Sequence, residues 1–244
     1  MRTLLVDWGD KKSCTRRELE SLIGHLSHAC KVIRPGRSFL RRMIELLHHN
    51  ENAQHVRLNR NFRSDLQWWK AFATSWNGIS YLATNASSQF ASDASGTWGC
   101  GAWFESSWFQ WQWGALSRDL DITVKELLPI LLATLIWGPA WHGKSVLCNC
   151  DNQAVVSILQ SRTCKQPGLM HMLRCLFFIE AANNFKLVAK HITSSENNVA
   201  DDLSRNNLQS FFSKVPTASR NQERVPEAAV ELLLDQQGDW TSPT

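Results

Sequence analysis

The stretch "SVLCNCDNQAVV", residues 145–156, decides the fold of this chain. Val146, Leu147 and Cys148 form a short apolar run of the kind found in a buried strand. The run ends on Asp151 and Asn152, and the pattern after these two residues becomes helical. Because an ionised carboxylate is costly to bury, an apolar strand that delivers one to its carboxyl end directs attention to the chemistry of that edge.

Size and composition indicate a folded protein whose charge is unevenly distributed. The chain has 244 residues, of which 43% are hydrophobic and 20% charged, so we expect one packed domain of ordinary size plus a smaller one. The net charge is +4, but residues 1–70 hold 14 Lys and Arg against 7 Asp and Glu, and the remaining residues carry a net charge of −3. A basic segment suggests a polyanion as partner, although a solvated helical face explains the same charge equally well.

Cysteine usage and hydropathy indicate a soluble, intracellular protein. The seven cysteines show no CxxC pair and no regular spacing, which favours reduced thiols over a disulfide framework. Cys148 and Cys150 flank a single strand residue and lack partner His or Cys pairs, so they give little support to a zinc site. The amino terminus has no apolar signal core, and the longest apolar run, residues 127–137, is shorter than the ~20 residues that span a membrane. We therefore predict no membrane association, and the sequence does not distinguish cytoplasm from nucleus.

The first third of the chain has the pattern of helices. Three segments, residues 15–30, 37–49 and 62–76, place apolar residues at helical spacing, with Pro and Gly between the first two. We assign residues 1–82 to a small helical region and the polar residues 83–88 to a linker.

From residue 89 the hydrophobic period changes to that of strands. Short aromatic segments between Gly and Ser turns predict three consecutive antiparallel strands. A long apolar helix, the strand quoted above, two helices, a fifth strand and a short helix follow, which gives the order βββαβααβα over residues 89–206. This order predicts an α/β fold, a mixed five-stranded sheet flanked by helices. Residues 207–244 are polar and contain prolines, and we expect a mostly flexible tail.

Four carboxylates fall at the ends of the predicted elements. Asp93 closes the first strand, Glu126 opens the long helix, Asp151 ends the fourth strand and Asp201 lies in the last helix. Adjacent strands would bring Asp93 and Asp151 to one edge of the sheet, and helices packed on the sheet would bring the other two alongside. Clustered carboxylates repel one another unless cations are present. Mg²⁺ and Mn²⁺ suit sites made of oxygen ligands and also assist phosphate chemistry.

Each carboxylate also has a structural explanation when it is considered alone. Glu126 completes a capping box with Thr123, and Asp151 is placed to cap the helix that follows it. Asp93 is a typical turn residue, and Asp201 is a typical exposed helix charge. The joint placement of the four supports a metal site, whereas no single one does.

The motifs around these carboxylates resemble those of a known enzyme family. "SDASGTWGCGAWF", "TVKELLPI", "CNCDNQAVV" and "HITSSENNVADDLSR" are similar, in this order, to the four catalytic blocks of a type 1 ribonuclease H. More narrowly, "RRELESLIGHLSHACKVIRPGRSFLRRMIELL", "HVRLNRNFRSDLQWW" and "DDLSRNNLQSFFSKVP" resemble the carboxyl part of DIRS-type retrotransposon polyproteins. There the ribonuclease H follows a reverse transcriptase and precedes a tyrosine recombinase. The ribonuclease blocks cover about residues 88–206, and the retroelement resemblance covers nearly the whole chain.

The resemblance implies roles for particular residues. Asp93, Glu126, Asp151 and Asp201 would be the catalytic carboxylates that bind two Mg²⁺ ions, with Mn²⁺ as a substitute. Asp201 matches the position of the family's carboxylate, whereas Asp202 takes the place of a variable residue. His191 matches a mobile loop histidine that would aid proton transfer or product release. The residues expected to contact the RNA strand are Ser95, Asn152 and Gln153.

The implied activity is endonucleolytic hydrolysis of the RNA strand of an RNA–DNA hybrid, with selectivity through 2′-hydroxyl contacts. The hybrid and other parts of a retroelement polyprotein are the expected partners, and no small-molecule cofactor is expected. Two alternatives remain open: an inactive or domesticated remnant that binds nucleic acid, and a transposase or integrase, which uses three carboxylates on the same fold.

Two departures from the family affect this expectation. Between the two central helices there is only "TCKQPG", with no room for the basic helix that some cellular enzymes use to hold a hybrid. The basic residues 1–70 would have to supply that contact. No YxDD-like polymerase motif occurs, so residues 1–82 resemble only the thumb and connection of a reverse transcriptase, and we expect no polymerase activity.

Overall fold

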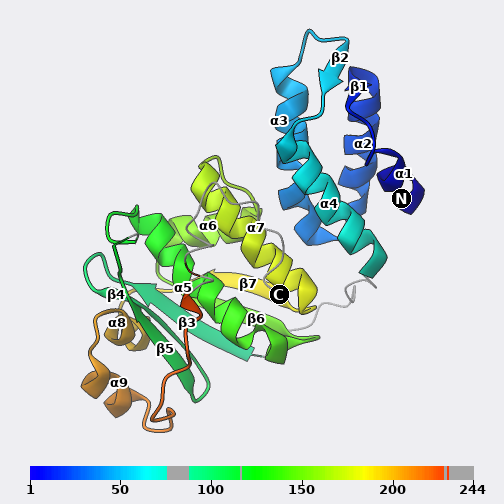
Figure 1. Ribbon diagram of the computed structural model, residues 1–244. Helices are drawn as coiled ribbons and strands as arrows, with labels where there is room; N and C mark the ends of the chain where they lie inside the picture. Colours follow the sequence, from blue (N-terminus) through cyan, green and yellow to red (C-terminus); the bar gives the residue numbers. More distant parts are fainter. Residues whose placement is uncertain (76–87, 116, 228–229, 231–244) are drawn as a thin grey trace. The chain divides into compact units, whose positions relative to one another are not determined.

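Five strands between residues 88 and 191 form one mixed sheet in the computed structural model (Figure 1). The structure describes residues 1–75, 88–115, 117–227 and 230. Antiparallel pairing joins the first three strands in the sequence, and parallel pairing places the fourth beside the first and the fifth beside the fourth. The order across the sheet is β5-β4-β3-β6-β7, which makes β3 the central strand. The strands are β3 (Ser88–Ala94), β4 (Gly99–Phe104), β5 (Ser107–Gln112), β6 (Ser145–Cys150) and β7 (Lys186–His191).

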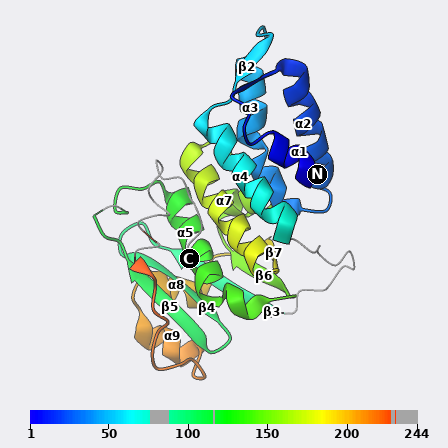
Figure 2. The same ribbon diagram turned by 45° about the vertical axis from the view of Figure 1, so that its right-hand side comes forward.

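Helices cover both faces of this sheet (Figures 1 and 2). On one face lie α5 (Ile122–Trp137), α6 (Gln153–Ser161) and α7 (Pro167–Ala182). On the other lie α8 (Asn198–Ser204) and α9 (Leu208–Lys214). Up to α8 the element order is βββαβααβα, so the predicted fold class, a ribonuclease H-like mixed sheet flanked by helices, is confirmed.

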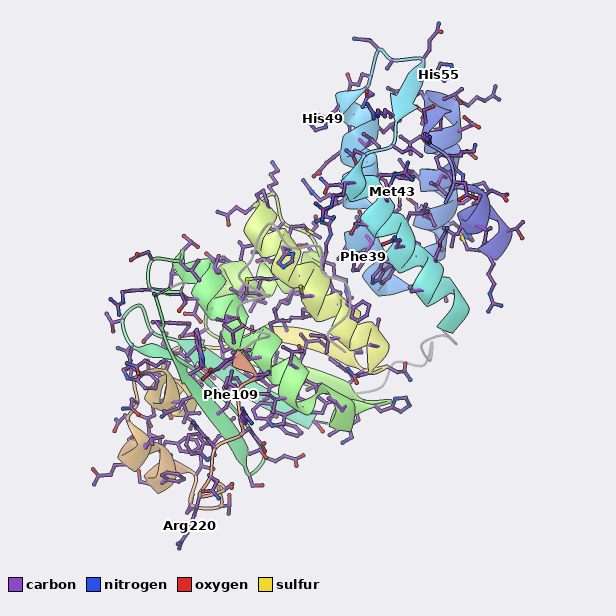
Figure 3. All side chains as sticks on the ribbon, in the orientation of Figure 1. Phe39, Met43, His49, His55, Phe109 and Arg220 are labelled. Atoms are coloured by element: carbon purple, nitrogen blue, oxygen red, sulfur yellow. The ribbon has the colours of Figure 1, made fainter. Side chains whose placement is uncertain are left out.

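The main hydrophobic core lies between the sheet and the helices α5, α6 and α7. Alternate strand residues point into it, as the two-residue period of a strand requires. The rings of Phe90 and Phe104 lie 5.3 to 6.4 Å, centroid to centroid, from those of Trp137 and Trp141. Phe109, labelled in Figure 3, is fully buried and contacts Trp137 at 5.5 Å. The aromatic residues of the strands therefore hold the long helix against the sheet.

Helix α5 is the apolar centre of this core. Together with the short 3-10 helix η2 (Gly138–Trp141) it forms a span of 20 residues, Ile122–Trp141, that is long and apolar enough to cross a membrane by length and composition. The prediction that this run is too short was therefore wrong about its length. Within this span, 67% of an 18-residue apolar stretch is buried inside the protein, as in the core helix of a packed domain.

The segment after α8 packs against the outer face of β5. Trp108 on that strand contacts Phe211 and Phe212 of α9, with ring centroids 5.3 and 5.6 Å away. The indole Nε1 of Trp108 donates to the carbonyl oxygen of Ser219 at 2.7 Å, and the backbone N–H of Glu223 donates to the carbonyl oxygen of Trp108 at 2.8 Å. The expectation of a flexible tail was therefore wrong for residues 207–227, because a large aromatic side chain on the outer face of the sheet requires cover.

The remaining parts of the predicted tail and linker lie largely outside the described residues. Residues 83–87 of the predicted linker are not described, and Ser88 begins β3. Most of the tail beyond residue 227 is also outside the described part of the chain. The chain divides into two compact units, Met1–Leu82 and Ala83–Thr244.

The described residues of the first unit, 1–75, form helices and two short strands joined by turns. Its helices are α1 (Arg2–Asp7), α2 (Arg16–Ala29), the 3-10 helix η1 (Arg34–Phe39), α3 (Arg41–His49) and α4 (Arg60–Ser75). Strands β1 (Ser13–Thr15) and β2 (His55–Arg57) pair antiparallel, which the sequence patterns did not predict. Three residues are too few to show a two-residue period, and their partner lies far away in the sequence.

Packing and capping explain the helices of this unit. Thr15 accepts from the backbone N–H of Glu18, and Glu18 accepts from that of Thr15, so a capping box begins α2. Phe39 stacks on Trp68 with ring centroids 3.8 Å apart, and Met43 is fully buried (Figure 3). Some of the basic residues pair with acids one turn away, as in Arg16–Glu20 at 2.9 Å.

Phe211→Ala tests whether α9 is part of the second unit. Phe211 is fully buried, so the substitution is expected to lower the free energy of unfolding by about 3–5 kcal/mol. Phe212→Ala, at a partly buried position one residue further on, serves as the matched control and should cost clearly less. Hydrogen exchange of the β4 and β5 amides in increasing urea measures both. Equal small losses in the two variants would mean that α9 does not pack on the sheet.

Candidate active site

Asp93 and Asp151 lie side by side at the carboxyl ends of adjacent parallel strands. Ala91 on β3 pairs with Asn149 on β6, and the same register brings Asp93 level with Asp151 two residues further along. The amide of Asn197 links them: its Nδ2 donates to Asp93 Oδ1 at 3.3 Å and to Asp151 Oδ1 at 3.4 Å. The parallel pairing therefore brings two of the predicted site residues together.

Asp93 is held beneath helix α8. Its side chain is 5% exposed, and Ser204 Oγ donates to its Oδ2 at 2.5 Å. Opposite Asp93 on β4 is Gly101, where an added Cβ would come within 2.5 Å of the Cβ of Leu203 on the same helix. A glycine at this position is what allows α8 to approach the sheet closely enough for Ser204 to reach the carboxylate.

Glu126 reaches the same edge of the sheet from helix α5. The N-cap of that helix is Asp121, whose side chain accepts from the backbone N–H of Thr123 at 2.8 Å, so the capping-box explanation for Glu126 was wrong. Glu126 is instead 8% exposed, and its Oε2 has no hydrogen-bond partner among the described residues. The backbone N–H of Ala94, the last residue of β3, donates to the carboxylate and lowers its pKa against the effect of burial.

The carboxylates act on one another electrostatically. Burial, together with the smaller effect of the negative charges of Asp93 and Asp151, raises the pKa of Glu126 to about 9. The pKa of Asp93 is raised to about 6, chiefly by burial and further by the charges of Asp151 and Asp201, while the hydrogen bond from Ser204 opposes the rise. Each of the four predicted carboxylates is therefore close enough to another of them to raise its pKa or to have its own pKa raised.

The side chains of Asp201 and its neighbour Asp202 have different hydrogen-bond partners. Asp201 is half exposed and accepts at 2.6 Å from Nε of Arg205, the residue that directly follows α8. Asp202 is buried and accepts from Lys214 Nζ at 2.6 Å and from Ser210 Oγ at 2.8 Å. Asp202 therefore joins α8 to α9, whereas Asp201 contributes to the raised pKa of Asp93.

The residues expected to contact RNA have mixed surroundings. The Ser95 hydroxyl is buried and accepts from the backbone N–H groups of Trp98 and Gly99, while it donates to the carbonyl oxygen of Gly99. Its hydrogen-bonding capacity is thus used within the β3–β4 turn, so the expected substrate contact through this hydroxyl is corrected. Asn152 is half-buried, and Gln153 is exposed at the start of α6.

Two further expectations concern the residues around Asp151. Asn152, rather than Asp151, caps helix α6: its Oδ1 accepts from the backbone N–H groups of Ala154 at 3.0 Å and Val155 at 3.1 Å. His191 ends β7 and is exposed, and its Nε2 lies 3.1 Å from the carbonyl oxygen of Asp151. The Asp151 carboxylate thus remains available at the edge of the sheet.

Three neutral residues around the carboxylates were not predicted. Asn197 is buried and also donates to the carbonyl oxygen of Ser92 at 3.1 Å, and Ser194 Oγ donates to Asp151 Oδ2 at 2.8 Å. Asn197 and Ser204 flank Asp201 at helical spacings of four and three residues, a signal that could have placed them on the same side of α8. Because these donors are uncharged, they orient the carboxylates without neutralising them.

The donor set fits a metal ion. Ligand atoms of Glu126, Cys150 and Asp151 lie within 4.8 Å of one another, and these three residues form a group that could hold one. The Oε2 atom of Glu126 is buried and accepts no hydrogen bond from the described residues, and a bound cation would give it a partner. The mutual repulsion of the carboxylates would be relieved by the same charge. Carboxylate oxygens suit a hard divalent cation, while the geometry alone leaves the identity of the ion open.

Comparisons with known proteins give little information about this chain. No protein-family profile matches it, and no curated protein matches it. Among solved structures, the protease–reverse transcriptase of prototype foamy virus is similar, with a TM-score of 0.30 and 10% sequence identity over 72% of this chain. The chain spans 24% of that protein's length. A similarity of this degree carries no argument about function, so function has to be inferred from the site itself.

Asn197→Ala tests the link between the two strand-end carboxylates. The substitution removes a buried donor from the carbonyl of Ser92 and from both carboxylates, so the free energy of unfolding should fall by about 1–3 kcal/mol. Asn198→Ala is the matched control, since that side chain is exposed and donates to the carbonyl of Ser195. Urea unfolding followed by hydrogen exchange of β3 and β6 amides compares the two. If both substitutions lower the free energy of unfolding by the same small amount, Asn197 does not orient the carboxylates.

Glu126→Gln tests the charge crowding through pH. In the metal-free protein the pKa of Glu126 is raised from 4.5 to about 9. Its contribution to stability is therefore complete below pH 4.5 and is lost as the pH rises to about 9. The wild type should lose stability across this range relative to Glu126→Gln, which cannot ionise. Thermal unfolding of both in EDTA measures the difference, and parallel pH profiles would show that Glu126 is not in a crowded, buried environment.

Proposed function

We propose that this chain is a ribonuclease H, a metal-dependent endonuclease that hydrolyses the RNA strand of RNA–DNA hybrids. The observation that carries the proposal is the convergence of carboxylates on one edge of a ribonuclease H-like sheet. Asn197 donates hydrogen bonds to both Asp93 and Asp151. The charge of Asp201 raises the pKa of Asp93, and the charge of Asp93 raises the pKa of Glu126. Such crowding costs stability in the metal-free protein, and a site that binds cations gives a reason for it.

The four carboxylates would share the binding of divalent ions, Mg²⁺ or Mn²⁺. When bound, such ions supply an activated water at neutral pH and neutralise the charge that develops on the phosphate. Asp93 and Glu126 would release their protons as the cations bind, since positive charge lowers the pKa of both carboxyl groups. Asn197 and Ser204 would keep Asp93 in place during this change. Arg205 would orient Asp201 from the solvent side.

Other residues would handle the proton and the substrate. His191 is exposed beside the carbonyl of Asp151, where its imidazole could give a proton to the leaving oxygen or accept one from water. Asn152 and Gln153, at the start of α6, would contact the RNA strand near the scissile phosphate and its 2′-hydroxyl groups. Ser95 is left out of this set, because its hydroxyl is occupied in the turn.

The origin and partners of the chain are also part of the proposal. The motif resemblance points to a DIRS-type retrotransposon polyprotein, so other parts of such a polyprotein are proposed partners. The basic residues 1–70, with a net charge of +7, would hold the phosphates of the hybrid. Binding should then weaken steeply with salt, as counterions are released from the nucleic acid.

Cleavage of a labelled RNA–DNA hybrid in Mg²⁺ tests the activity. Asp151→Asn should reduce the rate by more than about 100-fold, beyond the roughly 10- to 100-fold loss typical of residues that only support a ligand. Asp119→Asn removes an exposed carboxylate outside the site and should leave the rate unchanged. Only the RNA strand should be cut, and EDTA should abolish the reaction.

The alternatives give different outcomes in the same assay. Equal cleavage by the wild type and Asp151→Asn would refute the catalytic role of the carboxylates. Retained binding of the hybrid without any cleavage would identify an inactive remnant that binds nucleic acid. A strand-transfer product from duplex DNA would instead identify an integrase-like reaction.

A further inference from the structure

The sheet edge contains a sulfur atom that the proposed hydrolysis does not use. Cys150 is the last residue of β6, directly before Asp151, and its side chain is fully buried. The Sγ atom of Cys150 and carboxylate oxygens of Glu126 and Asp151 all lie within 4.8 Å of one another. Mg²⁺ and Mn²⁺ select oxygen ligands, whereas softer divalent ions also bind thiolate sulfur. Two kinds of ion could therefore bind at this edge, a hard ion through oxygen ligands and a softer ion through oxygen and sulfur. Their sets of ligands overlap.

A second, independent observation points to a cation at these atoms. Glu126 is 8% exposed, and its Oε2 is buried without a hydrogen-bond partner among the described residues. Leaving a buried acceptor unsatisfied is unfavourable, particularly for a group that can carry charge. An ion bound between Glu126 and the end of β6 would satisfy this oxygen.

The backbone around Cys150 suits a sulfur ligand. Its Sγ accepts from the backbone N–H of Asn152 at 3.4 Å, at the start of helix α6. Burial raises the pKa of the Cys150 thiol and has the larger effect, while this hydrogen bond lowers it, so the sulfur loses its proton only when an ion binds. Asp151 is half exposed, so an ion can enter the site from the solvent side.

We propose that Glu126, Cys150 and Asp151 form a binding site for a thiophilic divalent cation of the Zn²⁺ or Cd²⁺ type. On binding, the sulfur of Cys150 forms a bond to the ion and its proton passes to water, without any change of oxidation state. The ligand atoms of a tetrahedral zinc lie roughly 3–4 Å from one another. In this structure they lie within 4.8 Å, so small rotations of the side chains would bring them to that spacing. Because two of its ligands are carboxylates of the proposed active site, the ion excludes Mg²⁺ and inhibits hydrolysis. This inhibition rests on the proposed function, whereas the binding site itself does not.

Cadmium binding to the full chain tests the site by spectroscopy. Cd²⁺ should produce the ultraviolet charge-transfer absorption of a cadmium–thiolate bond, saturating at one ion per chain. Cys150→Ser should lose this absorption, and Glu126→Gln should weaken the apparent affinity by about 10-fold or more. Cys164→Ser replaces a half-buried cysteine outside the site and should leave both unchanged. An absorption that persists in Cys150→Ser, or none in the wild type, would overturn the proposal.

Two further measurements keep the result interpretable. Hydrogen exchange of the β6 amides establishes that Cys150→Ser is folded, and Cys150→Ala provides a second variant without a sulfur or hydroxyl ligand. In the cleavage assay at saturating Mg²⁺, both variants should require at least about 10-fold more Zn²⁺ for half inhibition than the wild type. Cadmium absorption without cleavage under any condition would refute the proposed function and leave the metal site standing. Cleavage in Mg²⁺ without cadmium absorption would do the reverse.

Discussion

The parallel pairing of β3 with β6 is the constraint on which the rest of the site depends. Two strands that run in the same direction end at the same edge of the sheet, so a carboxylate near the end of each must lie beside the other. In an antiparallel pair the same two residues would lie at opposite ends. The helix between these strands in the sequence, α5, has to cross the sheet to make the pairing parallel, and this crossing brings Glu126 to the same edge.

Concentrating negative charge at this edge opposes folding, and the surroundings limit that cost without removing the charge. Asn197, Ser204 and Ser194 donate neutral hydrogen bonds to Asp93 or Asp151. A lysine or arginine in their place would stabilise the carboxylates more strongly but would compete with a cation. Arg205 pairs with Asp201, which is half exposed, so water screens the interaction. Donors that hold the carboxylates and leave their charge intact are what a cation site requires.

Local patterns predicted most of the elements and the residues at their ends. The apolar strand that ends before Asp151 and the long apolar helix were both expected, and the structure contains them as β6 and α5. The errors concern groups for which several hydrogen-bond partners compete, and a segment that packs on a distant strand. The Thr123–Glu126 capping box fails because Asp121 caps the helix instead, and the Ser95 hydroxyl is consumed by a turn that its own type favours. The tail was expected to be flexible from its composition, but Trp108 on β5 offers it a surface to pack against.

The sequence by itself determined the order of strands and helices and the position of each carboxylate at the end of an element, because hydrophobic periodicity and turn residues act over a few neighbouring positions. Only the tertiary structure decided which faces meet, because that depends on contacts between residues about 50 to 110 positions apart. It placed Asn197 and Ser204 on the buried aspartate, turned Asp202 toward α9, and brought the Cys150 sulfur beside Glu126. The physical reason is that the pairing of β3 with β6 and the close approach of α8 to Gly101 are both settled by packing of the whole core.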